Sequence, residues 1–145
     1  MKIVLQRVKQ AAVVVDGEKI SEVERGFLIL LGAEKGDDEN RLQYWVDKCV
    51  GLRVFEDEQG KMNLAIGDAG GEMLVVSQFT LCADIARGRR PSFDKAMPPE
   101  QAEKMYEDFC NKVADKGIKV KRGRFGAKMN VELVNDGPVT LILAD

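Results

Sequence analysis

The sequence predicts an α+β fold, in which a strongly curved, mostly antiparallel β-sheet or barrel carries two packed helices. Two observations predict this class. Several short segments rich in β-branched residues are separated by turn signals, and two longer segments place apolar residues at helical spacing. Their order is strands, helix, strands, helix, strands, unlike the regular alternation of a doubly wound nucleotide-binding fold. The 145 residues suit a single domain, 1–145, with its own core.

The N-terminal third is predicted to be strands. Residues 3–8 and 11–15 are rich in valine and other β-branched residues, and Asp16-Gly17 is a strong signal for a two-residue hairpin turn. Residues 27–32 form a continuous apolar run, which is typical of a strand buried on both faces. These segments predict a sheet that begins with a hairpin.

Two helices are predicted from apolar stripes with clear start and stop signals. The first follows the turn Gly36-Asp37-Asp38, which supplies an N-cap, and ends near Gly51. Its stripe consists of Leu42, Trp45, Val46, Cys49 and Val50. The second begins at Pro98-Pro99 and ends before Gly117. Its stripe consists of Ala102, Met105, Tyr106, Phe109 and Val113.

The remaining strands are predicted in four short stretches, at residues 52–55, 73–77, 131–134 and 139–143. The last two are joined by Asn135-Asp136-Gly137-Pro138, which has the composition of a hairpin turn with proline at the start of an edge strand. Residues 82–99 have no clean period, and no element is predicted there.

Composition excludes most familiar catalytic chemistry. The chain has no histidine, which removes the usual general base, the histidine-activated nucleophiles and imidazole metal sites. Its three cysteines have no paired spacing and are predicted to be buried free thiols. We therefore expect no metal and no cofactor. The net charge of −2 argues against binding of nucleic acid through a global positive field, so local basic patches would have to bind it.

A cytoplasmic location is expected. The apolar runs are far shorter than the roughly 20 residues that cross a bilayer. The first residues become charged too early for a signal peptide, so no membrane association is expected.

Three features could carry chemistry, although each has a plain structural interpretation. Ser77-Gln78-Phe79-Thr80-Leu81 lies where a buried strand gives way to polar residues, and alone it would only end a strand. The Gly137-Pro138 segment alone would only turn the chain. Basic residues gather in two clusters. Such clusters are usually solvated surface, and their functional interpretation is that they bind the phosphates of an RNA. The clusters consist of Arg87, Arg89 and Arg90, and of Lys119, Lys121, Arg122 and Arg124.

Together these segments resemble the D-aminoacyl-tRNA deacylase family almost from end to end. The resemblance is carried by Gln6-Arg7-Val8, Gly51-Leu52-Arg53-Val54-Phe55, Gly60-Lys61-Met62-Asn63-Leu64 and Leu74-Val75-Val76-Ser77-Gln78-Phe79-Thr80-Leu81. Downstream it continues in Gly88-Arg89-Arg90-Pro91-Ser92-Phe93, Gly123-Arg124-Phe125-Gly126-Ala127 and Val134-Asn135-Asp136-Gly137-Pro138-Val139-Thr140. The one departure noticed is Lys128, where related sequences commonly carry an acidic residue.

The resemblance implies a deacylase-like fold and a homodimer that removes D-amino acids from mischarged tRNA. A cis Gly137-Pro138 element would reach from one subunit into the site of the other, with Arg7 holding it. Catalytic roles would fall to Ser77, Gln78, Phe79 and Thr80, and the substrate pocket would also include Leu81, Phe125 and Met129. Binding of tRNA would involve the residues Arg87, Arg89, Arg90 and Arg124.

Without histidine, two accounts of the hydrolysis are open. In one, Thr80 is the nucleophile, although no histidine or adjacent lysine could activate it. In the other, which the resemblance favours, the terminal 2′-hydroxyl of the tRNA helps to activate water, while backbone N–H groups near Phe79 and Thr80 stabilise the oxyanion. Backbone carbonyls at Gly137-Pro138 would accept the amino group of a D-residue and exclude an L side chain. Glycine would still be admitted, so glycyl-tRNA is an expected secondary substrate.

Two other functions remain open from the sequence. A non-catalytic dimeric RNA-binding module would suit the missing histidine, and a general esterase would cleave simple esters without tRNA. Release of D- but not L-tyrosine from tRNA distinguishes the deacylase from both.

Overall fold

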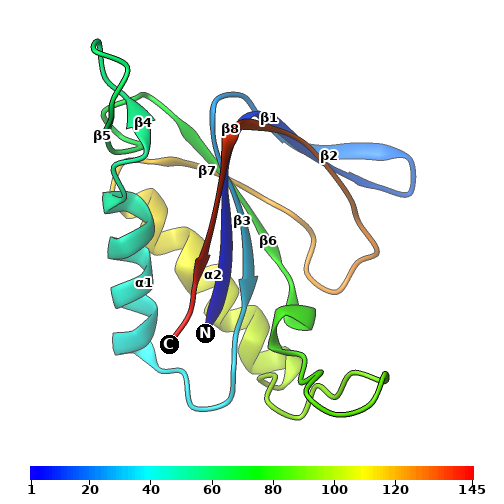
Figure 1. The fold of residues 1–145 in the computed structure, drawn as a ribbon. Helices are drawn as coiled ribbons and strands as arrows, with labels where there is room; N and C mark the ends of the chain where they lie inside the picture. Colours follow the sequence, from blue (N-terminus) through cyan, green and yellow to red (C-terminus); the bar gives the residue numbers. More distant parts are fainter.

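The computed structural model describes residues 1–145, which form one curved sheet with two helices packed on it (Figure 1). The sheet has the strand order β2-β1-β3-β6-β7, and β8 also pairs with β1. Its strands are β1 (Lys2–Val15), β2 (Glu18–Val23), β3 (Gly26–Gly32), β6 (Glu72–Ser77), β7 (Lys119–Arg122) and β8 (Asn130–Leu143). The strands β4 (Phe55–Glu56) and β5 (Met62–Leu64) form a separate two-stranded hairpin. The fold class predicted from the sequence is confirmed, with the addition that β6 pairs in parallel with β3 and β7.

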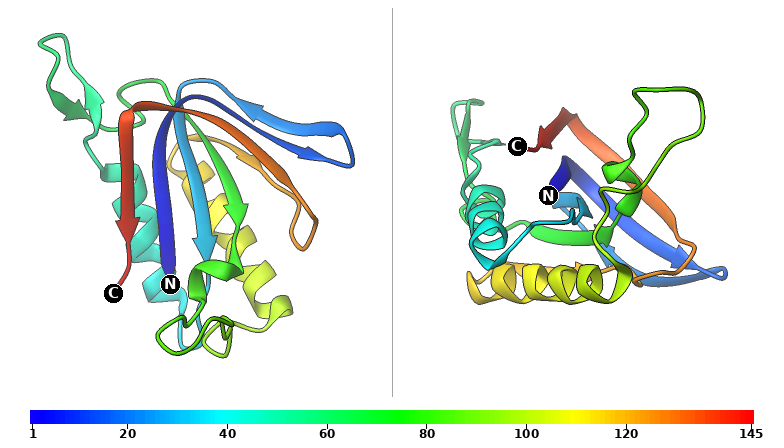
Figure 2. Two further views of the ribbon diagram at one scale, coloured as in Figure 1. Left: turned by 45° about the vertical axis from the view of Figure 1, so that its right-hand side comes forward. Right: turned by 90° about the horizontal axis from the view of Figure 1, so that it is seen from below.

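The long strand β1 organises the sheet because it pairs with three others. Its first half lies antiparallel to β3, its second half lies antiparallel to β2, and β8 runs along both halves. The register between β1 and β8 shifts near Val8, and such irregularities bend strands. Figure 2 shows the result: the hairpin of β1 and β2 swings away from the straight part of the sheet, so that the sheet is strongly curved and nearly closed.

This curvature gives the chain two apolar cores. The helices α1 (Glu39–Gly51) and α2 (Pro99–Asp115) pack with the larger core on one face of β3 and β6, against residues such as Phe27 and Val75. The alternate residues Leu28 and Leu74 face the smaller core, which is enclosed by the curled end of β1 and by β2. Because both faces of β3 are buried, its sequence is a continuous apolar run. None of the helices is long and apolar enough to span a bilayer.

All but one of the helix signals act as predicted. The Asp38 carboxylate accepts a hydrogen bond from the Arg41 backbone N–H at 2.9 Å and caps α1. The helix α2 begins at Pro99, which lacks an N–H group that the first turn would leave unpaired, and it ends before Gly117 at a φ of +85°. Gly51 belongs to the last turn of α1 rather than ending it, and Leu52 follows as the cap.

Three sequence predictions are wrong or incomplete. The predicted strands at 131–134 and 139–143 are one strand, β8, and the predicted turn between them is a bulge: Asn135 and Thr140 lie opposite Val8 and Gln6, so that residues 136–139 bulge out opposite Arg7. The strand predicted at 52–55 is reduced to Phe55–Glu56. The short elements β5, β7 and the 3₁₀ helix η1 (Phe79–Cys82) were not predicted, because each is too short or too polar to show a period.

Candidate active site

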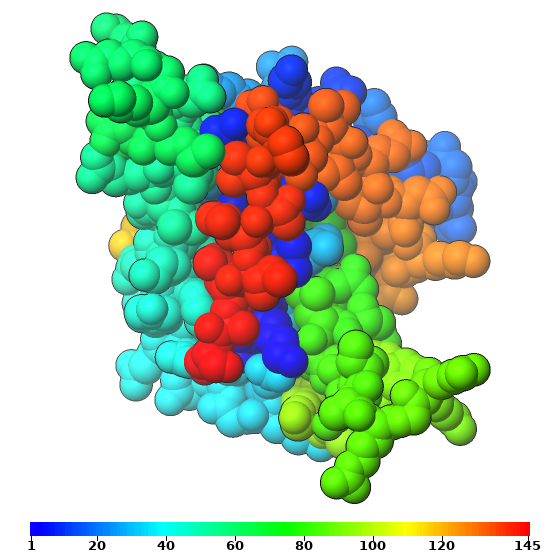
Figure 3. All heavy atoms as spheres, viewed as in Figure 1, coloured from blue at the N-terminus to red at the C-terminus, as the bar shows by residue number.

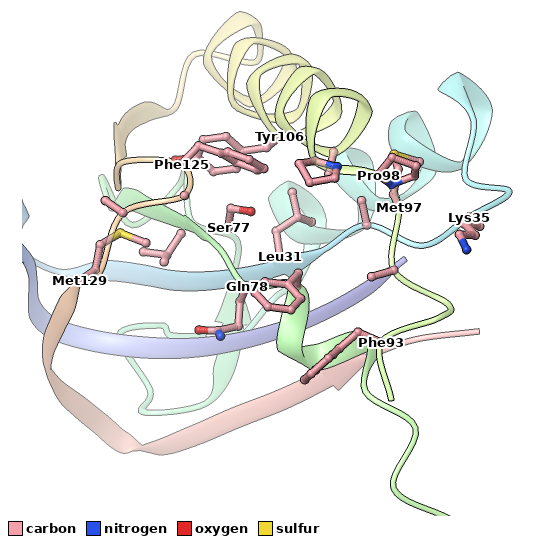
Figure 4. Close-up of a pocket in the computed structure, with 18 of the residues that line it drawn as sticks. Leu31, Lys35, Ser77, Gln78, Phe93, Met97, Pro98, Tyr106, Phe125 and Met129 are labelled. Carbon is pink, nitrogen blue, oxygen red and sulfur yellow. The ribbon is translucent and has the colours of Figure 1, made fainter. Parts of the chain in front are cut away.

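A cavity of about 650 Å³ opens where β3 and β6 end, beneath the start of α2 (Figure 4). Its lining is mostly apolar, with 13 hydrophobic residues of 19, which suits a ligand with a large apolar or aromatic surface. One end is lined by Phe125 and Met129, the middle by Leu31 and Ser77, and the other end by Met97 and Lys35 (Figure 4). The ends of two parallel strands therefore open into an elongated apolar site.

The segment that follows β6 supplies the polar part of this wall. Ser77 pairs with Leu31 at the end of the ladder, and the Gln78 N–H donates to the Leu31 carbonyl at 2.8 Å. Ser77, Gln78 and Phe79, to which the resemblance assigns catalytic roles, line this cavity. Thr80 does not, because the 3₁₀ turn that begins at Phe79 carries it away from the cavity wall to an exposed position. The hydroxyl of Thr80 accepts a hydrogen bond from the Gln78 amide at 2.5 Å.

The opposite wall comes from α2 and the segment before β8. The buried Tyr106 hydroxyl donates to the Val75 carbonyl at 2.8 Å, and its ring lies 6.2 Å from that of Phe125, centre to centre. Burial raises the pKa of Tyr106 well above its usual value, so the hydroxyl stays protonated. Of the residues that the resemblance assigns to the substrate pocket, Phe125 and Met129 line the cavity, whereas Leu81 does not.

Several lining residues were not identified from the sequence as site residues. Tyr106 was assigned only to the apolar stripe of the second predicted helix. Its phenol group was the one feature in the sequence that distinguished it from the other residues of that stripe. Phe93 comes from a segment without a period and stacks edge-on against the exposed Phe79, with ring centres 5.0 Å apart. Lys35 follows the end of β3 by three residues. This position marks it as a site residue only once the end of β3 is known to open into the cavity.

The cysteines are not candidates for a nucleophile. All three are free and buried, as predicted, and none lines the cavity. Burial raises the pKa of Cys49 to about 12 and that of Cys110 to about 11, and it also raises the pKa of Cys82. The thiols therefore stay protonated near neutral pH. No group of three or more acidic or cysteine side chains is placed to hold a metal ion.

The bulge in β8 is held by Arg7, which is only 4% exposed. Its Nε donates to the Asp136 carbonyl at 3.1 Å, and its Nη1 donates to the Val54 carbonyl at 2.5 Å. The Asn135 side chain accepts from the Val139 N–H at 3.1 Å, which closes the bulge from within. The Gly137–Pro138 peptide bond is cis, and both residues are exposed. The bulge is thus a supported element that presents its backbone at the surface.

Within a single chain, this bulge lies away from the cavity. The bulge lies opposite Arg7, which pairs with Phe27 near the start of β3, whereas Ser77 pairs with Leu31 near its end. At about 3.3 Å per residue, these positions are roughly 13 Å apart along the strand. In Figure 1 the bend of β8 is at the top of the molecule and the end of β6 is near the bottom. Gly137 and Pro138 do not line the cavity.

None of the predicted basic residues lines the cavity. Arg87, Arg89 and Arg90 are exposed in a loop that is closed by two backbone hydrogen bonds between Asp84 and Ser92, of 2.7 and 3.0 Å. This loop projects from the surface beside the end of β6 (Figure 3). Arg124 is also exposed, next to Phe125. In contrast, Lys119 is paired with Glu72 at 2.6 Å.

Gly32 fixes the path of the Ser77 segment, and its replacement tests that dependence. A Cβ atom there would lie 2.9 Å from the Gln78 carbonyl and 3.0 Å from the Cys82 sulfur. Gly32→Ala should therefore shift the cavity wall. We expect it to lower kcat/KM for a reaction in this cavity about 10- to 100-fold. It should also lower the free energy of unfolding by about 1–3 kcal/mol. The control is Gly67→Ala, whose Cβ would make only an ordinary 3.5 Å contact with Ile118. Wild-type kinetics in Gly32→Ala, measured alongside urea unfolding, would contradict this account.

Comparison with known proteins places these features in a family. The family model described as D-Tyr-tRNA(Tyr) deacylase matches residues 4–144. The chain is 57% identical over 139 residues to the D-aminoacyl-tRNA deacylase of Thermodesulfovibrio yellowstonii, covering 96% of this chain and 95% of the relative. It is 50% identical over 143 residues to the protein of the same name from Thermosipho africanus, covering 99% and 96%.

Two solved structures share the fold of this chain. A protein named c-Myc DNA Unwinding Element Binding Protein is 45% identical, with a TM-score of 0.94, covering 100% of this chain and 99% of that one. A second, described as "a probable eukaryotic D-amino acid tRNA deacylase", is 16% identical with a TM-score of 0.83 over 98% and 97%, which shows a shared fold. The match of the family model to almost the whole chain and the identity to its relatives show that this chain belongs to the D-Tyr-tRNA(Tyr) deacylase family.

Proposed function

We propose that this protein is an editing hydrolase of the cytoplasm that cleaves the ester between a D-amino acid and the terminal adenosine of tRNA. The products are the free D-amino acid and tRNA. The observation that carries the proposal is the apolar cavity at Ser77, Gln78 and Phe79 in a chain that matches the deacylase family over residues 4–144. An aminoacylated adenosine has the mixed aromatic and polar surface that such a cavity accommodates.

The cavity supports a placement for this substrate. The aromatic wall of Phe125 and Tyr106 offers a surface for the adenine base, which would leave the ribose and its ester in the middle, beside Ser77 and Gln78. The first N–H groups of η1 belong to Phe79 and Thr80 and have no acceptor within the helix. The Phe79 N–H, which belongs to a residue of the cavity wall, is suited to stabilise the oxyanion that forms when water attacks the ester.

Selection of the D-isomer is proposed to require a second copy of the chain. Gly137 and Pro138 are exposed and firmly held, yet they lie away from their own cavity, so a homodimer would let one subunit supply them to the other. The strand β8 has a paired neighbour on one side only, and it exposes Leu133 and Ile142. The backbone carbonyls of the bulge would accept the amino group of a D-residue and leave no room for an L side chain. Glycine has no side chain to exclude, so glycyl-tRNA is a secondary substrate in this proposal.

The basic loop is proposed to guide the tRNA. Arg87, Arg89 and Arg90 are exposed in the loop that precedes Phe93 of the cavity wall, and Arg124 is exposed next to Phe125 of the same wall. Guanidinium groups match phosphate oxygens well, and these four residues supply the local positive charge that the net charge of −2 does not.

The hydrolysis is proposed to depend on the 2′-hydroxyl of the tRNA rather than on a protein nucleophile. Thr80 is exposed, its hydroxyl is engaged by Gln78, and the chain contains no histidine to activate it. Thr80→Ala should therefore keep kcat within about 10-fold of the wild type, because only the hydrogen bond to Gln78 is lost. Single-turnover rates on D-tyrosyl-tRNA measure this, with Thr80→Ser as the variant that retains the hydroxyl. Abolished turnover in Thr80→Ala, with fold and tRNA binding intact, would establish the nucleophile instead.

Release of tyrosine from D-tyrosyl-tRNA and L-tyrosyl-tRNA tests the function itself. The proposal expects release from the D-ester alone. Failure to release either amino acid, with tRNA still bound, would indicate the RNA-binding module. Turnover of simple esters without tRNA would indicate a general esterase.

A further inference from the structure

Lys35 differs from every other residue of the cavity because it is the only charged one. It lies at the end formed with Met97, opposite the end formed by Phe125 and Met129 (Figure 4). A single cation at one end of a mostly apolar cavity suits an elongated ligand. Such a ligand would place an anionic group at the Lys35 end and an aromatic group at the Phe125 end.

The Lys35 ammonium is also free to bind such a group, since it makes no ion pair. The two nearby carboxylates already have other partners. Glu34 lies 3.2 Å from the Met1 ammonium and 3.6 Å from the Lys2 ammonium, and Asp37 lies 2.7 Å from the Met1 ammonium. The neighbouring Lys95 is itself paired with Asp84 at 3.7 Å. Lys35 is therefore a cation whose local counterions are engaged elsewhere.

The backbone that carries Lys35 is hydrogen-bonded to residues 95–97, the segment that precedes α2. Its N–H donates to the Lys95 carbonyl at 2.9 Å, and the Met97 N–H donates to the Ala33 carbonyl at 3.0 Å. Glu34 and Ala96 form an antiparallel bridge between these two bonds. The backbone at Lys35 is therefore tied to the segment of Ala96 and Met97, which lines the same cavity.

On this basis we infer that Lys35 binds the phosphate that joins the terminal adenosine of the substrate to the preceding nucleotide; this rests on the proposed function. With the base against Phe125 and the ribose beside Ser77, the end of the cavity that remains for the ribose 5′-phosphate is the one lined by Met97 and Lys35. This phosphate is unchanged when the ester is hydrolysed, so its contact with Lys35 is expected to contribute to substrate affinity rather than to the chemical step; lysine binds it as a point charge.

Binding of unesterified ligands tests this contact without turnover. The probes are adenosine and the dinucleotide cytidylyl-(3′→5′)-adenosine, which adds the phosphate in question. Lys35→Ala should weaken binding of the dinucleotide about 3- to 10-fold and leave adenosine binding unchanged, as expected for one partly solvated charge pair. Lys35→Arg should restore it. Lys48→Ala, which removes an exposed lysine on α1 outside the cavity, is the matched control.

Kinetics on D-tyrosyl-tRNA give a second, independent measurement. Lys35→Ala should raise KM with kcat unchanged and reduce the slope of log KM against log salt by about 0.7, the value for one phosphate contact on a single strand. Equal effects on adenosine and the dinucleotide, or no effect on either, would overturn the inference. If the wild type binds the dinucleotide through Lys35 but hydrolyses no ester, the proposed activity fails and the phosphate contact stands.

Discussion

Gly137→Ala should lower kcat/KM for D-aminoacyl-tRNA by about 100-fold or more while the fold stays intact. A Cβ atom at this position would lie 2.7 Å from the Arg7 Nη2 and 3.1 Å from a Val139 methyl group. Arg7 cannot move away easily, because it is buried and hydrogen-bonded to the Asp136 and Val54 carbonyls. The φ of +123° at Gly137 also disfavours any residue with a side chain.

The bulge must therefore shift, and its carbonyls must move from the position at which they would meet the substrate. Displacements of about 1 Å in such elements can cost about 100-fold in rate. Single-turnover deacylation measures the loss, and circular dichroism verifies the fold. The matched control is Gly60→Ala, which has a positive φ of +74° but no atom within 4 Å of the added Cβ. Near-wild-type turnover by Gly137→Ala would show that the bulge does not act on the substrate.

The same bulge marks a limit of the sequence analysis. Asn135, Asp136, Gly137 and Pro138 have the composition of a hairpin turn, and the prediction of a turn followed from that composition. In the structure β1 continues past this point and pairs with β8 on both sides of it. The pairing partner, 129 residues away for Arg7 and Asp136, decides between a turn and a bulge. Local signals sufficed where the determinant was local, as at the Asp38 cap of α1.

The candidate site was predictable in part for a related reason. Ser77 was identified because the polar end of an apolar strand is visible in the sequence itself. Tyr106, Phe93 and Lys35 were not, since their significance depends on which segments meet at one end of the sheet. Thr80 was assigned to the site as part of the segment 77–81 that carries the family resemblance, and the 3₁₀ turn at Phe79 removes it from the cavity wall. Sequence neighbours share a site only while the backbone keeps its direction.

The pairing of β3 with β6 underlies both the cavity and the stability of the fold, and Gly26→Ala tests it. Gly26 lies opposite Glu72 at the start of this ladder, where the backbones approach so closely that an added Cβ would lie 1.7 Å from the Glu72 carbonyl oxygen and 2.6 Å from its nitrogen. Both contacts are with backbone, so no side-chain rotation relieves them. One strand must move away from the other, which breaks the hydrogen bond between the Glu72 N–H and the Arg25 carbonyl.

We expect Gly26→Ala to lose more than about 4 kcal/mol out of a typical total of 5–15 kcal/mol. With a wild-type stability near the lower end of that range, much of the variant should be unfolded at 37 °C, and the cavity should be lost with it, because Leu31 and Ser77 end the same ladder. Urea unfolding measures the change. Gly51→Ala is the control, since it lies in the last turn of α1 with no atom within 4 Å, and alanine there should be neutral or stabilising by up to about 1 kcal/mol. Equal midpoints for the two variants would mean that β6 can shift at little cost, and that the ladder does not position Ser77 as tightly as these distances require.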